Sequence, residues 1–221
     1  MNFDMAAEML SDAGSQVMTV TTNDDVAVED SLYTTGRRGV AGTLVVEKVV
    51  GAAAETGLGL QALKALGDKV NSRTRSIGVA LTSCTVPAAG NPTFSIGDDE
   101  MEMGVGIHGE PGRRRVDLQP ADRIAEEMVT AILGDLGASS GEALLFVNGF
   151  GATPAMELYL VYNAARGLLE RQGLTVARAL VGNYVTSLDM AGCSITVTLL
   201  DEEIARHWDA PVHTAGLRWG M

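Results

Sequence analysis

The stretch "ALLFVNGFGATPAMELYLVYNAARGLLERQ" (143–172) sets the fold class, because it passes from one type of secondary structure to another. Its first part, 143–149, opens with the apolar run 143–147 and is typical of a buried strand, and the part from Thr153 to Gln172 has helical spacing. In the glycine-rich turn between them, Pro154 suits the first helical position and Thr153 suits the cap before it. A strand, a short turn and a helix in this order predict an α/β protein.

The same alternation of strands and helices continues on both sides of this unit. Further strands are expected at 16–22, 76–86, 100–107, 175–183 and 191–200. Further helices are expected at 3–13, 40–55, 59–70, near 119–136 and after residue 201, followed by an irregular tail. The helix at 40–55 is apolar nearly all round, which predicts that it is buried. We expect an α/β sandwich or open sheet, and the change of hydrophobic period near residue 75 predicts a domain boundary there.

Composition narrows the classes of partner. With 221 residues and 46% hydrophobic content, the chain can bury a sizeable core as one large or two small domains. A net charge of −12 argues against nucleic acid and anionic membranes, which are themselves negative. No apolar stretch reaches the ~18 residues of a membrane helix, and the start "MNFDMAAEM" does not resemble a signal peptide. Cys84 and Cys193 are interpreted as buried thiols, with a disulfide or reactive role as the alternative, so a cytoplasmic setting is expected.

The loop "GVGIHGEPG" (104–112) has the G-x-G-x-x-G spacing of dinucleotide-binding loops. Such a loop must join a strand to a helix, because the helix N-terminus holds the pyrophosphate. Here the segment after the glycines contains two prolines and shows no helical spacing until about residue 120. The context therefore argues against a dinucleotide site.

Strict alternation along 101–108 offers another interpretation of the loop. If this segment is extended, its apolar residues share one face, and the other face carries Glu102, Gly104, Gly106 and His108. Glycine weakens a strand, so a face cleared by glycines beside a histidine suggests close approach by a ligand. The alternative is a bulge or backbone contact, with His108 as an ordinary loop histidine.

His108 could act as a metal ligand, as a general acid or base, or as a nucleophile. A metal site is poorly supported, because the other histidines lie near the C-terminus without ligand spacing. A catalytic triad stays open, although no G-x-S-x-G motif is present. A neutral imidazole that acts as a base or adds to a carbonyl is plausible, with Glu110 or Glu102 as its orienting carboxylate.

Two further groups of residues could bind anions or partners. Gly149 and Gly151 lie in the strand–turn–helix unit, where a helix N-terminus could hold an anion, although a tight turn with a capped helix explains them equally. Arg113 begins an arginine triplet that could contact a phosphate or an acidic partner, or could be a solvated face. The acidic groups at 24–25 and 98–100 are interpreted as solvated turns, with a metal role as the alternative.

Several long motifs together resemble the substrate-binding K subunit of dihydroxyacetone kinases. They are "DDVAVEDSLYTTGRRGVAGT" (24–43), "RSIGVALTSCTVPAAG" (75–90), "MEMGVGIHGEPG" (101–112), "VNGFGATPAMELY" (147–159), "GNYVTSLDMAG" (182–192) and "DAPVHT" (209–214). The resemblance implies that His108 forms a covalent hemiaminal with the ketone carbon of dihydroxyacetone. It also makes Gly104, Gly106, Gly109 and Glu110 the accompanying candidates for substrate binding. Gly149, Gly151 and Arg113 remain candidates for an anion or partner contact.

The resemblance also implies an architecture and partners. Family members have two α/β domains, so residues 1–74 would be the remainder of an incomplete first domain and 75–200 the second, with 201–221 returning to the first. The family's "GSGHEP"-like and "KNYTGD"-like motifs, which carry an acid/base histidine and an aspartate, do not occur here. ATP or ADP with Mg is expected on a partner domain or subunit, and a homodimer is expected. Alternatives are a regulatory dihydroxyacetone-binding protein without kinase turnover, or a truncated remnant that does not complete turnover.

Overall fold

The alternating direction of side chains along each strand gives the sheet two apolar faces, and helices cover both. In the computed structural model, which describes residues 2–28, 36–107 and 114–220, Leu145 and Val147 belong to one core cluster. Their neighbours Leu144 and Phe146 belong to the other cluster. Because successive side chains of a strand point to opposite sides, one strand contributes to both cores.

The helices of the described residues are α1 (Asn2–Asp12), α2 (Gly42–Glu55), α3 (Leu60–Ser72), α4 (Ala121–Leu136), α5 (Ala155–Arg171) and α6 (Glu202–Asp209). The strands are β1 (Thr74–Ala80), β2 (Glu100–Met103), β3 (Arg114–Asp117), β4 (Gly141–Gly149), β5 (Leu174–Gly182), β6 (Gly192–Leu199), β7 (Val212–His213) and β8 (Arg218–Trp219). Mixed α/β architecture is thereby confirmed, whereas the division into two domains stays a prediction.

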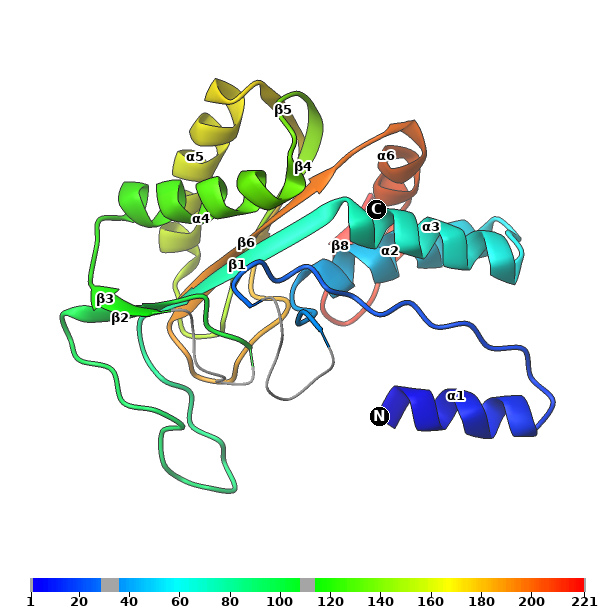
Figure 1. The fold of residues 1–221 in the computed structure, drawn as a ribbon, viewed down its shortest axis with the longest axis horizontal. Coiled ribbons are helices and arrows are strands. Elements are labelled where there is room, and N and C mark those ends of the chain that lie inside the picture. Colours follow the sequence, from blue (N-terminus) through cyan, green and yellow to red (C-terminus); the bar gives the residue numbers. More distant parts are fainter. Residues whose placement is uncertain (1, 29–35, 108–113, 221) are drawn as a thin grey trace.

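Six of these strands form one sheet in the order β3-β2-β1-β6-β4-β5. β4 and β5 are parallel, because α5 carries the chain back between them, and the other neighbouring pairs are antiparallel. β1 lies near the middle of the sheet and pairs with β6 along its whole length, from Thr74 opposite Thr198 to Ala80 opposite Gly192. Figure 1 shows β1 and β6 crossing the molecule side by side.

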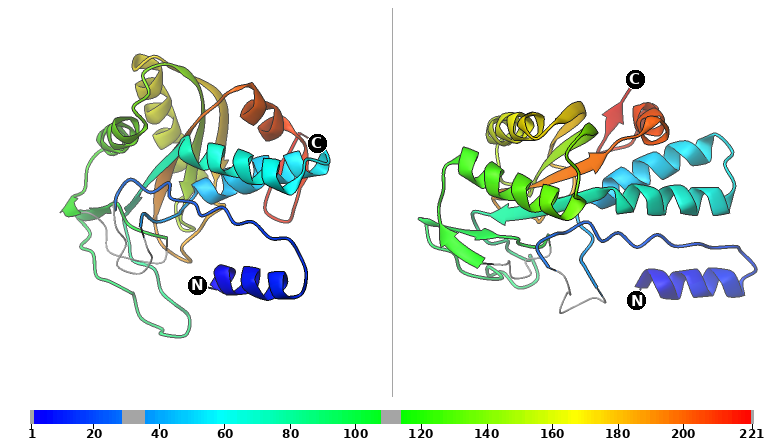
Figure 2. Two further views of the ribbon diagram at one scale, coloured as in Figure 1. Left: turned by 45° about the vertical axis from the view of Figure 1, so that its right-hand side comes forward. Right: turned by 45° about the horizontal axis from the view of Figure 1, so that its top comes forward.

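Two layers of helices cover opposite faces of the sheet. α4 and α5 lie on one face, where Met128 and Leu169 pack in the larger core cluster. α2, α3 and α6 lie on the opposite face, where Val45 and Trp208 pack in the second cluster (Figure 2). The expected burial of the apolar helix at 40–55 is confirmed, since α2 includes Val45, Val49 and Ala53 with no exposed surface.

The N-terminal segment contributes little to either core. α1 confirms the helix expected at 3–13, but none of its described residues is buried. Figure 1 shows it standing apart from the sheet and connected to it by an extended segment. The strand expected at 16–22 is wrong, because this segment is extended but pairs with no strand among the described residues.

Several other expected boundaries need correction. The strand expected at 76–86 ends at Ala80, and the strand expected at 100–107 ends at Met103. β3 was not anticipated, since its sequence "RRVD" is mostly charged and lies at the sheet edge. The tail is less irregular than expected, because β7 and β8 pair as a short antiparallel hairpin.

Candidate functional site

The glycine-rich segment leaves the sheet at Gly104, four residues earlier than strict alternation predicts. Gly104 has φ +79, a left-handed conformation that glycine adopts without strain and that ends β2. Val105 and Gly106 are both buried. The interpretation of this segment as a strand face cleared by glycines is therefore wrong for its described part, Gly104–Ile107, because the backbone turns at Gly104 before the alternation can continue.

The first residues of this segment are held against β1. The Gly104 N–H donates to the Gly78 carbonyl, with 2.6 Å between nitrogen and oxygen. A Cβ at Gly78 would lie 3.0 Å from the Val105 carbonyl oxygen, so the absent side chain of Gly78 allows this close approach. Val105 packs in a small core cluster with Phe150 and Met190. His108, Gly109, Glu110 and Arg113 lie outside the described residues, and Gly104–Ile107 is the described approach to them.

Arg38 binds the peptide carbonyl that follows Gly104. Its Nη2 donates to the Gly104 carbonyl at 2.8 Å, and its Nε donates to Asp25 Oδ2 at 2.8 Å. Nη2 also lies 2.7 Å from Asp25 Oδ2, so the guanidinium bridges a carboxylate and a backbone carbonyl. Arg38 is 7% exposed and Asp25 is 1% exposed, which makes this a buried ion pair.

Asp24 fixes the backbone around Arg38. Its carboxylate accepts hydrogen bonds from the N–H groups of Val40 and Gly42 at 2.9 and 2.8 Å. The hydroxyl of Ser76 on β1 donates to the same carboxylate at 2.5 Å. Asp24 and Asp25 thus link three segments that are distant in sequence: the chain before α2, the start of α2 and the sheet.

The acidic pair at 24–25 was interpreted as a solvated turn, and this is wrong because both carboxylates are buried. Burial raises the pKa of Asp25 to about 6, against the attraction of Arg38, which lowers it. Desolvation of the charged carboxylate therefore outweighs the stabilisation that the guanidinium provides. The acidic group at 98–100 differs, because Asp98 and Asp99 are exposed as expected.

On its far side the loop returns to the sheet as β3, which pairs antiparallel with β2. The loop thus joins two antiparallel strands, whereas a dinucleotide fingerprint requires a strand followed by a helix. Of the arginine triplet, Arg114 pairs with Glu127 of α4, and Arg115 pairs with Glu102 at 3.3 Å. Glu102 is thus bound to an arginine on the neighbouring strand.

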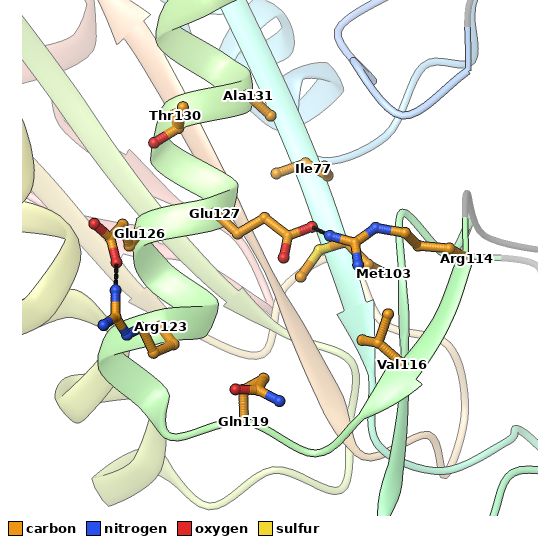
Figure 3. A pocket seen from close by; sticks show the side chains of 10 residues that line it. All are labelled: Ile77, Met103, Arg114, Val116, Gln119, Arg123, Glu126, Glu127, Thr130 and Ala131. Carbon is orange, nitrogen blue, oxygen red and sulfur yellow. Dashed lines mark hydrogen bonds and ion pairs between the residues drawn. The ribbon is translucent and has the colours of Figure 1, made fainter.

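A cavity of about 830 Å³ lies between α4 and the β2–β3 hairpin. Figure 3 shows Arg114 and Arg123 reaching into it, each joined to a glutamate of α4, Glu127 and Glu126 respectively. Because each of these guanidinium groups is neutralised by a neighbouring carboxylate, the cavity does not present the concentrated positive charge of a phosphate site.

The turn at 149–154 uses its backbone donors within the chain. The N–H groups of Phe150 and Ala152 donate to backbone carbonyls of the 190–192 segment, and that of Gly151 donates to Asn183 Oδ1. Pro154 rather than Thr153 occupies the cap position of α5. The Thr153 hydroxyl instead donates to the Gly192 carbonyl and accepts from the Gly192 N–H, which ties the turn to β6.

Both cysteines of the chain lie among the described residues. Cys84 and Cys193 are free and buried, as expected, and burial raises the pKa of Cys193 to about 12. The described part of the chain groups no three His, Cys, Asp or Glu side chains in a way that could hold a metal ion. Nor does it contain a helix that combines the length and the apolar composition needed to cross a membrane.

Sequence reasoning missed Asp24, Asp25 and Arg38 as parts of the site. Polarity alone favoured a solvated turn for the aspartates, and burial depends on contacts with Ser76 and Gly104 that are distant in sequence. The signal that could have identified them was their place in "DDVAVEDSLYTTGRRGVAGT" (24–43), a motif that carries the family resemblance.

Helices on both faces of a mixed sheet make this a three-layer α/β protein. Its candidate site combines a glycine-rich loop with a buried ion pair that binds the start of that loop. A family model described as the Dak1 domain matches residues 1–216, and the chain belongs to this family. It is 47% identical to the dihydroxyacetone-binding subunit DhaK of the PEP-dependent dihydroxyacetone kinase of Escherichia coli, over 100% of this chain and 69% of the relative.

Other relatives and solved structures agree with this assignment. The DhaK subunit of PTS-dependent dihydroxyacetone kinase 1 of Listeria innocua is 48% identical over 92% of this chain and 62% of its own length. The chain thus spans about two thirds of the length of these two subunits. A dihydroxyacetone kinase operon co-activator, Dha-DhaQ, has a TM-score of 0.87 and 32% identity over 95% of this chain and 65% of its own. The dihydroxyacetone kinase of C. freundii has a TM-score of 0.83 and 30% identity over 99% of this chain and 39% of its own. The resemblance inferred from the motifs is confirmed.

Proposed function

We propose that this chain is the substrate-binding part of a dihydroxyacetone kinase. In this proposal His108 captures dihydroxyacetone, or a similar short ketone or aldehyde, as a covalent hemiaminal. A partner domain or subunit that carries ATP or ADP with Mg then phosphorylates it. The observation that supports this most strongly is 47% identity, over the whole chain, to a subunit named for binding dihydroxyacetone.

Hemiaminal formation needs a neutral imidazole and an electrophilic carbon. The lone pair of one ring nitrogen attacks the ketone carbon and forms a C–N bond, while the π electrons of the carbonyl move to its oxygen. That oxygen takes up a proton and the ring loses its N–H proton, so imidazole N–H has added across C=O and nothing leaves. Glycerol lacks an electrophilic carbon, so this chemistry selects ketones and aldehydes over alcohols.

Covalent capture would hold the terminal hydroxyl in a fixed position for phosphoryl transfer, a reaction in which positioning supplies much of the rate. A fixed carbonyl carbon requires a fixed histidine backbone. The described approach to His108 is suited to this, because Gly104 bonds through both its N–H and its carbonyl, and Val105 packs in a core cluster.

The capture is tested by incubating the protein with dihydroxyacetone labelled with ¹³C at the carbonyl carbon. We expect the ketone signal to be joined by that of a tetrahedral carbon, and intact-protein mass spectrometry to show addition of one dihydroxyacetone without loss of water. His108→Ala should abolish both signals, whereas the exposed His213 provides a matched control, His213→Ala, that should retain them. An adduct that persists in His108→Ala would contradict the proposal.

A regulatory dihydroxyacetone-binding protein is the second candidate, favoured by the structural likeness to an operon co-activator. Both candidates capture the ketone, and they differ in whether the captured ketone is then phosphorylated. Adding the purified nucleotide-binding subunit of a dihydroxyacetone kinase with its phosphoryl donor should yield dihydroxyacetone phosphate if the chain serves a kinase. Capture without any phosphorylated product supports the regulator, and absence of both supports a remnant.

A further inference from the structure

We infer that Arg38 is a positioning residue for the reactive loop: its guanidinium ties the Gly104 carbonyl, from which the chain runs to His108, to the buried carboxylate of Asp25. The inference rests on the proposed function for the identity of the reactive group. The contacts that carry it join Arg38, Asp25 and Gly104, all of which lie among the described residues.

The bridge depends on the shape of arginine. Nε and Nη2 approach Asp25 Oδ2 at 2.8 and 2.7 Å, and Nη2 also reaches the Gly104 carbonyl at 2.8 Å. A planar guanidinium holds its donors in a rigid fork, whereas a lysine ammonium is a compact point charge on a flexible stem. Lysine could keep the charge interaction with Asp25 but would not hold the same two acceptors in one fixed geometry.

Stability is a poor explanation for this ion pair. Removing two charges from water is unfavourable, and the attraction between them often fails to offset that penalty. Here burial raises the pKa of Asp25 despite the adjacent guanidinium, which indicates the same imbalance. A buried pair in which desolvation outweighs the attraction of the guanidinium, and which bonds to the backbone at the start of the reactive loop, is better explained by the position it imposes.

The position of the backbone at Gly104 affects the position of His108, because the chain runs from Gly104 to His108 in four residues. The Gly104 N–H donates to the Gly78 carbonyl of β1, and the Gly104 carbonyl accepts from Arg38, so the peptide groups before and after the Gly104 Cα are both held where the chain leaves the sheet. Arg38 is in turn oriented by Asp25, whose other oxygen accepts the Ala27 N–H at 2.9 Å. Misplacement by about 1 Å can lower the rate of an oriented reaction by about 10²-fold.

The neighbouring arginine offers a matched control. Arg37 pairs with Asp135 at the end of α4, with Nη2 and Oδ1 2.8 Å apart, and belongs to the same turn of the chain. The test compares Arg38→Met, Arg38→Lys and Arg37→Met for capture of the ¹³C-labelled dihydroxyacetone. Circular dichroism and thermal unfolding establish that each variant is folded at the temperature of the measurement.

We expect Arg38→Met to bind at least about tenfold more weakly, equivalent to about 1.4 kcal/mol, and Arg38→Lys to be intermediate. Arg37→Met should bind within about twofold of the wild type. Folded Arg38→Met that captures dihydroxyacetone as well as the wild type would overturn the inference. If Arg38→Met does not fold, Arg38→Lys decides, because wild-type affinity in that variant would show that the fork is not needed.

A second readout separates this inference from the proposed function. If the wild-type protein forms no adduct, the proposed function fails, but the ¹H–¹³C signal of the His108 imidazole can still be measured and assigned with His108→Gln. We expect Arg38→Lys to move this signal and Arg37→Met to leave it in place. A His108 signal that is the same in all three proteins would refute the role of Arg38.

Discussion

At the scale of single residues, Asp25 is a carboxylate whose charged form is disfavoured by burial in the folded protein. Its carboxylate is buried with Arg38, and desolvation raises its pKa from 3.8 to about 6. The folded protein therefore binds a proton at Asp25 between about pH 4 and pH 6, where the unfolded chain does not. Stability contributed by the protonated group is fully present below the unfolded pKa and is lost as the pH rises through the folded pKa.

This linkage predicts the direction and the size of the change in unfolding free energy with pH. The free energy of unfolding of the wild type, relative to that of Asp25→Asn, should fall by on the order of 3 kcal/mol between about pH 4 and pH 7. Urea unfolding of both proteins across this range measures the difference, and the common contribution of other groups cancels. A difference that stays constant or increases with pH would show that the pKa of Asp25 is not raised.

At the scale of elements, α2 and the C-terminal hairpin are joined by Lys48. Its Nζ donates to the Ala210 carbonyl at 2.9 Å and lies 5.2 and 5.9 Å from the ring centroids of Trp208 and Trp219. The two indole rings pack edge to face with centroids 5.6 Å apart. Lys48 of α2 thus contacts both ends of a tail that the sequence alone predicted to be irregular.

Lys48→Met retains most of the side-chain volume but removes the ammonium group. We expect it to lower the free energy of unfolding by about 2 kcal/mol, since both a charged hydrogen bond and cation–π contacts are lost. Unfolding can be followed by tryptophan fluorescence, because the two tryptophans of the chain are the two that Lys48 contacts. Lys64→Met is the control: Lys64 is paired with Asp68 on the surface of α3, and its loss should change stability by less than about 0.5 kcal/mol.

At the scale of the whole molecule, stability resides in the sheet and its two helical layers rather than in α1. No described residue of α1 is buried, and Phe3, Met9 and Leu10 are each more than half exposed. Exposed apolar surface of this kind promotes association more than it stabilises the chain that carries it.

Deleting residues 1–12 should therefore change the free energy of unfolding by less than about 0.5 kcal/mol and reduce concentration-dependent association in analytical ultracentrifugation. Met128→Ala in α4 provides the contrast, because Met128 is completely buried and its truncation should lower the free energy of unfolding by about 2–5 kcal/mol. A deletion as destabilising as Met128→Ala would show that α1 contributes to the folded core.

Hydrophobic periodicity was sufficient to predict most of the elements. α2, α4, α5, β4 and β6 lie within a few residues of the expected ranges, because each buries a regular stripe or an unbroken apolar run. It failed for 16–22, an alternating segment without a strand partner among the described residues, and for the charged edge strand β3. Whether an extended segment becomes a strand depends on a neighbour for its hydrogen bonds, and periodicity does not report that neighbour.

The amino-acid sequence was enough to predict the α/β class, the family and His108 as the reactive candidate, because periodicity and long motifs are local properties of the chain. The burial of Asp24 and Asp25, the turn at Gly104 and the bridge through Arg38 came only from the folded structure. These features join segments that lie far apart in sequence, as Arg38 and Gly104 do. The pKa of a carboxylate and the direction of a loop depend on what surrounds them, and packing in three dimensions supplies those surroundings.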